Sequence, residues 1–409
     1  MAERAHEAAH ERGFSRTELA DQVNHRSRLD AVGHRRAERE GRGLVGKETF
    51  QRYHRAVETV IENLPVEERV KRWGRELGFD AVAIAGIDLA EDEARLIEWL
   101  DRGWHGEMDY MARHGARRAR PVELVPGTAS IITARLNYQS ADARDSAQVL
   151  EDPERAFVAR YALGRDYHKV LRAKLQALAE RMTSELGPFH YRVFTDSAPV
   201  MEVSLAAASG LGWRGKHTLL LSRDAGSLFF LGELFVSLDL KKDAATTAHC
   251  GTCERCIEIC PTRAIVAPYQ LDARRCIAYL TIEHHGPIPE ELRPLMGNRI
   301  YGCDDCQIVC PWNKYAQAWT DPDFAVRHHL DDAILVDLFA WTADEFDQRM
   351  EGSPIRRIGH ERWLRNIAVA LGNAPTAPRV VEALRSRADD PSPLVREHVC
   401  WALERHRAI

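Results

Sequence analysis

The chain has 409 residues, of which 45% are hydrophobic and 29% charged, and its formal net charge is −5. This composition is typical of a globular protein of two or three domains, and the charge excludes a uniformly basic nucleic-acid binder. The chain contains neither a run of ~20 apolar residues for a membrane span nor an apolar signal core near its start. We therefore expect a cytoplasmic protein without a membrane partner.

The first domain begins after a polar arm. Residues 1–47 are rich in Arg, His, Glu and Ala, which predicts a disordered arm without an assigned function. Apolar spacing then predicts helices over 50–63 and 66–77, a buried strand over 81–85 and a helix around 96–100. We place this domain over residues 48–244.

The rest of the first domain continues to alternate between strands and helices. We expect a strand over 130–134, a long amphipathic helix over 166–186, a strand over 191–195 and a helix ending at Ala208. Residues 219–222 and 227–236 are interpreted as a β-hairpin. The alternation predicts an α/β or α+β domain.

Asp196 stands where the strand over 191–195 ends, followed by Ser197, Ala198 and Pro199. One interpretation is a helix cap, because Asp and Ser accept hydrogen bonds from the free N–H groups of a helix start. The other is a general acid beside a redox centre. Both stay open, since Ser197 could cap while Asp196 faces a cavity.

Residues 210–217 form a glycine-spaced loop with cations, Gly-Leu-Gly-Trp-Arg-Gly-Lys-His. Its glycines could let the backbone approach a flat or phosphate-bearing ligand, but the spacing is not that of a P-loop or a dinucleotide fingerprint. The alternative is a tight helix-to-strand turn.

Eight of the nine cysteines form two runs. The cysteines are Cys250, Cys253, Cys256 and Cys260, then Cys276, Cys303, Cys306 and Cys310, with proline after Cys260 and after Cys310. This spacing is typical of two [4Fe–4S] clusters in which the cysteine before each proline crosses to the other cluster. We assign Cys250, Cys253, Cys256 and Cys310 to cluster 1, and Cys260, Cys276, Cys303 and Cys306 to cluster 2.

The second run departs from a symmetric ferredoxin, which would place a cysteine at Ile300 and instead has Cys276 far upstream. A pair of four-cysteine zinc sites is the alternative, although zinc does not require the Cys-x3-Cys-Pro ending twice. A disulfide framework is disfavoured in a long chain with clustered cysteines. We expect a ferredoxin-like domain with both clusters over residues 245–320.

The C-terminal region, residues 321–409, holds a linker and an imperfect repeat. Residues 364–371 resemble residues 396–403, with a further helical stretch over 377–387 and a helix-start turn over 389–393. This pattern predicts a HEAT-like α-helical repeat. Cys400 falls on the expected buried face, which predicts a structural residue rather than a cluster ligand.

Two basic stretches, residues 113–120 and 356–365, could each neutralise several phosphates of an RNA. The alternative for such runs is a solvated surface.

Together these strings resemble the epoxyqueuosine reductases. The similar segments are residues 160–168, 196–199, 208–216, 226–233, 297–304 and 365–373, together with both cysteine runs and the detached Cys276. The resemblance covers residues from about 66 to the C-terminus.

The resemblance implies a multidomain α+β enzyme with an α/β cobalamin-binding reductase domain. It implies an oxidoreductase that completes queuosine synthesis by removing the epoxide oxygen of epoxyqueuosine at the tRNA wobble position. The implied cofactors are two [4Fe–4S] clusters and a base-off cobalamin. The implied partners are tRNA, held partly by the C-terminal repeat, and an external low-potential electron donor; we expect a monomer.

Residue roles follow from the same resemblance. The implied proton donor is Asp196, which would need a pKa raised by burial to act as an acid. The implied cobalamin contacts are Arg118, Ala159, Arg160, Asp196, Lys216, Leu220, Ser227 and Leu231. Some members carry cysteine near position 159, so Ala159 puts a thiol role there in doubt.

Two other functions stay open. A corrinoid iron–sulfur reductase could act on a small molecule such as an organohalide, although such enzymes usually carry an export signal. A ferredoxin-type electron carrier would need neither the large first domain nor Asp196.

Overall fold

The computed structural model describes residues 64–318 and 322–407, and the chain divides into two units, residues 1–72 and 73–409. The first unit is represented only by the start of helix α4 (Val66–Glu76), which confirms the helix predicted over 66–77. The polar arm over 1–47 and the helix predicted over 50–63 lie outside the described residues. The elements from β1 onward all belong to the second unit.

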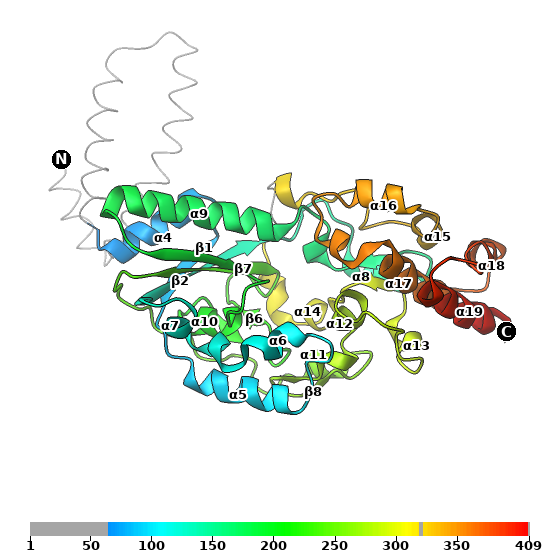
Figure 1. The fold of residues 1–409 in the computed structure, drawn as a ribbon, viewed down its shortest axis with the longest axis horizontal. Helices are drawn as coiled ribbons and strands as arrows, with labels where there is room; N and C mark the ends of the chain where they lie inside the picture. Colours follow the sequence, from blue (N-terminus) through cyan, green and yellow to red (C-terminus); the bar gives the residue numbers. More distant parts are fainter. Residues whose placement is uncertain (1–63, 319–321, 408–409) are drawn as a thin grey trace, which may run out of the picture. The chain divides into compact units, whose positions relative to one another are not determined.

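An antiparallel sheet of four strands forms the centre of the first domain (Figure 1). Its order is β1 (Ala81–Ala85), β2 (Ser130–Asn137), β7 (Phe229–Val236) and β4 (Tyr191–Thr195), and every neighbouring pair is antiparallel. The predicted strands are confirmed. Of the two fold classes expected, this sheet supports α+β, and the α/β description is wrong because it implies parallel strands.

Helices α9 (Tyr167–Leu186) and α10 (Glu202–Ala208) cover opposite faces of this sheet (Figure 1). Side chains alternate along β7, so Gly232 faces α9 while its neighbours Leu231 and Glu233 face α10. A Cβ atom on Gly232 would lie 2.8 Å from Leu175 Cδ1, so the helix can approach only because this residue is glycine. The polar residue of this strand, Glu233, therefore lies on the face that α10 covers.

The predicted hairpin is wrong. Strand β6 (Leu220–Leu221) pairs with β5 (Trp213–Arg214), whereas β7 pairs with β2 and β4. Only an isolated bridge joins Ser222 to Gly226. The first part of the glycine-spaced loop is the helix-to-strand turn between α10 and β5, and Gly210 adopts a φ of +80° there. The rest forms β5 and the residues after it, of which Lys216 and His217 are buried.

Short elements complete the first domain. They are α5 (Ala90–Asp101), α6 (Asp109–His114), α7 (Pro121–Leu124), α8 (Ser146–Glu151) and β3 (Phe157–Val158), with 3-10 turns at Gly115–Ala119 and Arg160–Ala162. The α5 helix confirms the one expected around 96–100.

The cysteine segment consists of brief helices and strands. They are α11 (Arg255–Glu258), β8 (Ile265–Ala267), β9 (Gln270–Leu271), α12 (Ile277–Ile282), α13 (Arg293–Met296), β10 (Arg299–Tyr301) and α14 (Asp305–Ile308), with 3-10 turns at Ala273–Arg275 and Pro311–Tyr315. Strand β10 pairs in parallel with β3, which ties this segment to the first domain.

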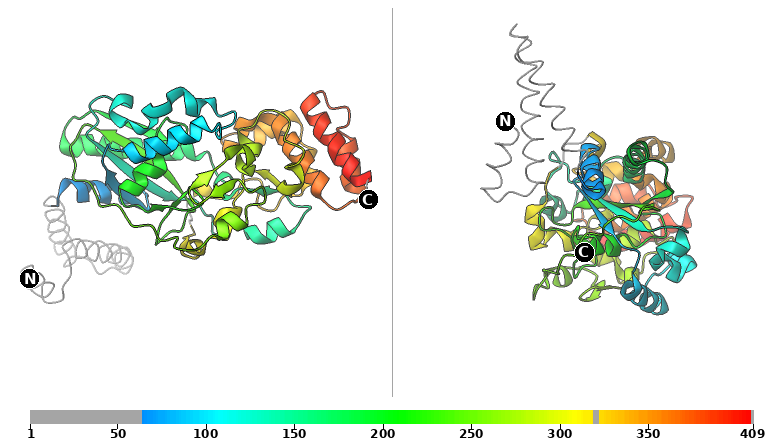
Figure 2. Two further views of the ribbon diagram at one scale, coloured as in Figure 1. Left: turned by 90° about the horizontal axis from the view of Figure 1, so that it is seen from below. Right: turned by 90° about the vertical axis from the view of Figure 1, so that its left-hand side faces the viewer.

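The C-terminal region is helical. Its helices are α15 (Leu335–Phe339), α16 (Ala343–Arg349), α17 (Gly359–Asn373), α18 (Pro378–Arg385) and α19 (Pro393–Arg407), with 3-10 turns at Pro322–Phe324 and Pro354–Ile358. Figure 2 shows α17 to α19, orange to red, beside the yellow-green cysteine segment and away from the green strands of the sheet. Cys400 on α19 is exposed, so its predicted place on the buried face is wrong.

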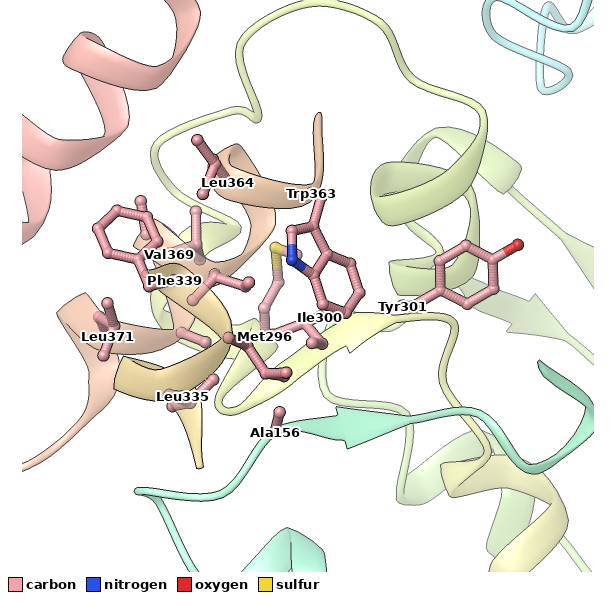
Figure 3. Packing of buried hydrophobic residues seen from close by; sticks show 14 of the residues in the cluster. Ala156, Met296, Ile300, Tyr301, Leu335, Phe339, Trp363, Leu364, Val369 and Leu371 are labelled. Carbon is pink, nitrogen blue, oxygen red and sulfur yellow. The ribbon is translucent and has the colours of Figure 1, made fainter. Parts of the chain in front are cut away.

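One apolar core joins these helices to the cysteine segment (Figure 3). Trp363 of α17 is fully buried and packs near Phe339, Met296 and Ile300. Ile300 occupies the position where a symmetric ferredoxin would carry a cysteine, and here its side chain is 0% exposed within this core. The cluster ligand must therefore come from another part of the chain.

Candidate functional site

The cysteines form the two groups predicted from their spacing. Cys256 interacts electrostatically with Cys250, Cys253 and Cys310, and these four line a cavity of about 290 Å³. Cys310 therefore leaves its own run and joins the first. Burial raises the pKa of Cys256 to about 11, so binding of iron at this thiol would release a proton.

The second group lines a different cavity, of about 440 Å³. Its cysteines are Cys260, Cys276, Cys303 and Cys306. Cys306 interacts with both Cys276 and Cys260, so the detached cysteine and the crossing cysteine meet here. Cys276 directly precedes α12, and the N–H groups of Ala278 and Tyr279 point at its sulfur.

Asp196 lies on the wall of the same cavity as the second cysteine group. Helix α10 begins at Glu202, with Met201 in the cap position, so the interpretation of Asp196 as a helix cap is wrong. The Asp196 side chain is 52% exposed, and it projects into this cavity. Its carboxylate is thus available for chemistry rather than engaged in capping.

Two residues at the start of α9 hold the Asp196 carboxylate. The Tyr167 hydroxyl donates a hydrogen bond to Asp196, and His168 Nε2 lies 3.2 Å from the same oxygen. Burial raises the pKa of Asp196, but the hydrogen bonds from His168 and Tyr167 outweigh it and lower that pKa below its ordinary value. The expected raised pKa is therefore wrong for this structure.

His168 is itself held between two carboxylates. Its Nδ1 lies 2.7 Å from Asp166, and Arg357 in turn lies 3.2 Å from Asp166. Burial lowers the pKa of His168, but hydrogen bonds to Asp166 and Asp196 outweigh it, so the net pKa is raised. The proton of this group belongs to a His168–Asp196 pair rather than to Asp196 alone.

The cavity has a second acidic feature on the sheet side. Glu202, the first residue of α10, lines the cavity, and Glu233 of β7 lies behind it with 0% exposure. Burial raises the pKa of both carboxyls well above the ordinary value, and the charge of Asp196 raises each further.

The predicted cobalamin contacts divide into two sets. Leu220, Ser227 and Leu231 line the cavity together with Asp196. Four do not: Lys216 lines the neighbouring cavity of the first cysteine group, Arg160 lines a third cavity of about 1050 Å³, and Ala159 and Arg118 are buried and line none of these three. Each of these four residues has another partner in the protein, through its backbone or its side chain.

These partners are structural. The Arg160 backbone N–H donates to Asp304 at 2.7 Å, and Ala159 N–H donates to the Tyr301 carbonyl. Arg118 donates to the Tyr110 carbonyl at 3.0 Å. Lys216 lies 3.7 Å from Glu254.

Residue-level sequence reasoning missed Tyr167, His168, Glu202 and Glu233. Tyr167 and His168 stand in a segment that resembles the epoxyqueuosine reductases, and Glu233 ends another, but nothing in their spacing assigns them to Asp196. Only the packing of α9 and α10 against β7 and β4 brings them there.

The basic stretches are less free than their sequences suggest. In residues 356–365, Arg365 is 0% exposed and donates to the carbonyls of Leu280, His284 and Gly286. In residues 113–120, Arg118 is buried, and Arg120 pairs with Glu93 at 2.7 Å. Arg365, Arg118 and Arg120 therefore already have partners in the protein, whereas Arg356 and Arg357 of the second stretch are exposed.

Two family models match the chain. Residues 249–313 match a 4Fe-4S double cluster binding domain, which supports iron–sulfur clusters over the zinc alternative. Residues 118–197 match a model described as epoxyqueuosine reductase QueG, DUF1730.

Curated relatives match over most of their length. An epoxyqueuosine reductase of Pseudomonas aeruginosa is 60% identical over 340 residues, which cover 83% of this chain and 94% of the relative. The epoxyqueuosine reductase of Escherichia coli K12 is 56% identical over 336 residues, 82% of this chain and 88% of the relative.

Solved structures agree with this similarity. A crystal structure of epoxyqueuosine reductase with a tRNA-Tyr epoxyqueuosine-modified stem loop matches with a TM-score of 0.76 and 28% identity, covering 83% of this chain and 90% of that one. A structure of the Bacillus subtilis epoxyqueuosine reductase, with its catalytic aspartate loop swung out of the active site, matches with a TM-score of 0.75 and 28% identity over the same shares.

Proposed function

This chain belongs to the epoxyqueuosine reductase family, and from this premise we propose that it removes the epoxide oxygen of epoxyqueuosine at the wobble position of tRNA, leaving queuosine. The reaction takes up two electrons and two protons and releases the oxygen as water. One observation carries the proposal: a single cavity has Asp196 and the four cysteines of the second group on its walls. The organohalide alternative is set aside, because relatives at 53–60% identity are epoxyqueuosine reductases.

Iron–sulfur clusters fit the two cysteine groups. Each group has four sulfur ligands around its own cavity, which is what a [4Fe–4S] cluster requires. We assign Cys250, Cys253, Cys256 and Cys310 to one cluster, and Cys260, Cys276, Cys303 and Cys306 to the other. The second cluster would lie nearest to Asp196, so electrons from an external donor would pass through the first.

Cobalamin fits the remaining wall of the Asp196 cavity. Leu220, Leu231, Val203 and Phe229 supply apolar surface for a flat macrocycle, and Ser227 supplies a polar group at its edge. When bound, cobalamin would supply the nucleophile that opens the epoxide. The other four predicted cobalamin contacts do not line this cavity, so their assignment is weaker: Arg118, Ala159, Arg160 and Lys216.

The chain's own residues would handle the protons. Opening of an epoxide leaves negative charge on oxygen, which an adjacent acid neutralises. Asp196 is the group on the cavity wall that would deliver this proton, and His168 would recharge it through Nε2. Tyr167 fixes the carboxylate by its hydrogen bond, so the acid keeps one orientation.

The substrate would be the anticodon stem loop of tRNA, as in the solved relative. The modified base would leave its stack to enter the cavity, and such extrusion costs a few kcal/mol. Arg357 is exposed beside His168, so it could meet a phosphate near the entrance. We also propose three functional regions. Residues 48–244 would bind cobalamin, residues 245–320 would form the ferredoxin-like domain, and residues 321–409 would form a HEAT-like region that binds tRNA. We propose that the enzyme is monomeric and cytoplasmic; among the described residues no helix is long and apolar enough to cross a membrane.

The test is conversion of epoxyqueuosine-containing tRNA by anaerobically reconstituted protein with cobalamin and a low-potential reductant. We expect queuosine in the digested tRNA. An absorption spectrum first establishes that both cofactors are bound. A folded protein with both cofactors that yields no queuosine would contradict the proposal.

A further inference from the structure

Glu233 is an unusual residue for the middle of a sheet. It lies on central strand β7 opposite Thr133 of β2 and Phe194 of β4, and its side chain is 0% exposed. Within the described residues, neither of its carboxyl oxygens has a hydrogen-bond partner of normal geometry. Burial of an unpaired carboxylate costs several kcal/mol, so the neutral acid is the stable form here.

Glu202 faces Glu233 from α10. This helix packs against β7. One Glu202 oxygen is buried without a hydrogen-bond partner, and its carboxyl interacts with that of Glu233. The titratable groups that act on the pair are Asp196 and Tyr167, which carry negative or no charge. Among the described residues no cation acts on Glu233, and the contact that favours ionisation of Glu202 is a hydrogen bond from the Asp196 backbone N–H.

The proposed reaction requires more protons than Asp196 holds. Two carbon–oxygen bonds break, a carbon–carbon double bond forms, and both protons end on the same oxygen. Asp196 has a lowered pKa, so it passes protons on but does not store them. His168 can supply one proton through Asp196, and the second comes either from solvent or from another acid beside the cavity.

We propose that Glu202 and Glu233 form a protonated carboxyl pair that supplies this second proton, with Glu202 passing it to Asp196. This inference rests on the proposed function. After the transfer the pair keeps one proton, shared as a hydrogen bond between a carboxyl and a carboxylate, which is a strong bond in a buried site. The step moves only a proton: Asp196 hands it to the departing oxygen, which leaves as water, and solvent restores the pair.

The protonation state can be tested on the reconstituted holoprotein without substrate. Infrared spectra of the protein at pH 7 should show the carbonyl stretch of protonated carboxyls, shifted in D2O, and Glu202→Gln and Glu233→Gln should each remove part of it. Asp80→Asn is the matched control, because Asp80 is a half-buried carboxyl before β1 that lies outside the cavity and accepts a hydrogen bond from Asn137 N–H. An unchanged band in both glutamine variants would overturn the proposal.

The role in catalysis needs a kinetic test with the reconstituted holoenzyme. Glutamine keeps the shape of the acid but cannot give up a proton, so Glu202→Gln should slow single-turnover conversion by about tenfold or more, with tRNA binding unchanged. The wild-type rate should also fall at alkaline pH as the pair ionises, and Glu233→Gln should shift this limb. Normal turnover and an unshifted pH profile in both variants would overturn the proposal even if the infrared band is present.

The two tests distinguish failure of the carboxyl-pair proposal from failure of the proposed function. If wild-type holoenzyme does not convert epoxyqueuosine tRNA, the function is wrong while the infrared result still reports on the pair. If Glu202→Gln loses its cluster absorption, Glu233→Gln carries the test, because Glu233 does not line the cavity of the second cysteine group. Asp80→Asn should convert tRNA at the wild-type rate.

Discussion

The four-stranded sheet and the cysteine segment are stabilised in different ways. In β2 every residue is buried, and Ile131, Ile132, Ala134 and Leu136 are 0% exposed. In residues 249–276 the buried apolar side chains are few: Cys256, Ala264, Ile265 and Ala273. The sheet has an apolar core of its own, whereas the cysteine loops depend on what their sulfurs bind.

In the proposed function the two regions also have different tasks: residues beside the sheet transfer protons, and the cysteine segment delivers electrons. The sheet holds the buried carboxyl of Glu233 beside Glu202 and places Asp196 directly after the end of β4. The cysteine segment contributes the two cysteine groups, and a buried carboxyl of its own on the cavity wall, that of Asp304, accepts a hydrogen bond from the Arg160 N–H. Variants in the two regions should therefore lose different properties: stability or proton transfer for the sheet, and iron content for the cysteine segment.

The largest effect should come from Asp196→Asn. Asparagine keeps the hydrogen bond from Tyr167 but cannot transfer a proton, so we expect conversion to fall by about 10²–10⁴-fold. Both clusters should remain, because Asp196 lies outside the cysteine groups. Anaerobic single-turnover assays with cluster absorption as the control measure this, and near-normal turnover would remove Asp196 from the proton path.

Loss of one cluster should affect the cysteine segment and leave the sheet intact. Cys276→Ala removes a ligand of the second group, so bound iron should fall by about half. Hydrogen exchange should increase in residues 249–276 and stay unchanged in β7. Cys400→Ser is the control, since Cys400 is exposed on α19 and should keep full iron content; full iron in Cys276→Ala would contradict the ligand assignment.

A change within the sheet should do the reverse. In Gly232→Ala the new methyl group would lie 2.8 Å from Leu175 Cδ1 and 3.1 Å from Leu171 Cδ2. Such overpacking costs about 1–3 kcal/mol of unfolding free energy, measurable by urea denaturation, while iron content should not change. Gly86→Ala is the control because its Cβ would meet only Lys242, at 3.8 Å; equal stability of the two variants would show that α9 can move.

The smallest effect should be the pH dependence contributed by His168. Its pKa is raised in the folded protein, so its stabilisation is complete below the ordinary histidine pKa of about 6.5 and is lost as the pH rises through the folded value. His168→Gln should therefore cost on the order of 1 kcal/mol at pH 5.5 and little at pH 9. Equal losses at both pH values would show that His168 is neutral in the folded protein.

Much of the fold and half of the site follow from local patterns. The strands over 81–85 and 191–195 agree with the structure because short apolar runs between turns leave few alternatives. The hairpin over 219–236 does not, because strand partners depend on residues far away in the chain, and β7 is captured by β2 and β4.

The same limit applies to charged residues. Arg365 belongs to a basic stretch whose composition suggests phosphate binding, yet tertiary packing buries its side chain against three backbone carbonyls. Asp196 has the sequence of a helix cap, yet α10 starts at Glu202. In both cases the side chain's role depends on neighbours from distant segments.

By itself the sequence determined the family to which the chain belongs, and it predicted the cysteine grouping, including the detached Cys276. Ligand spacing is a covalent property, because a short loop limits which sulfurs can reach one cluster. Only the tertiary structure decided the surroundings of the acids: the hydrogen bonds that lower the pKa of Asp196, its link to His168, and the contact of Glu202 with the buried Glu233. These depend on burial and on charges brought together across the fold, which no local pattern records.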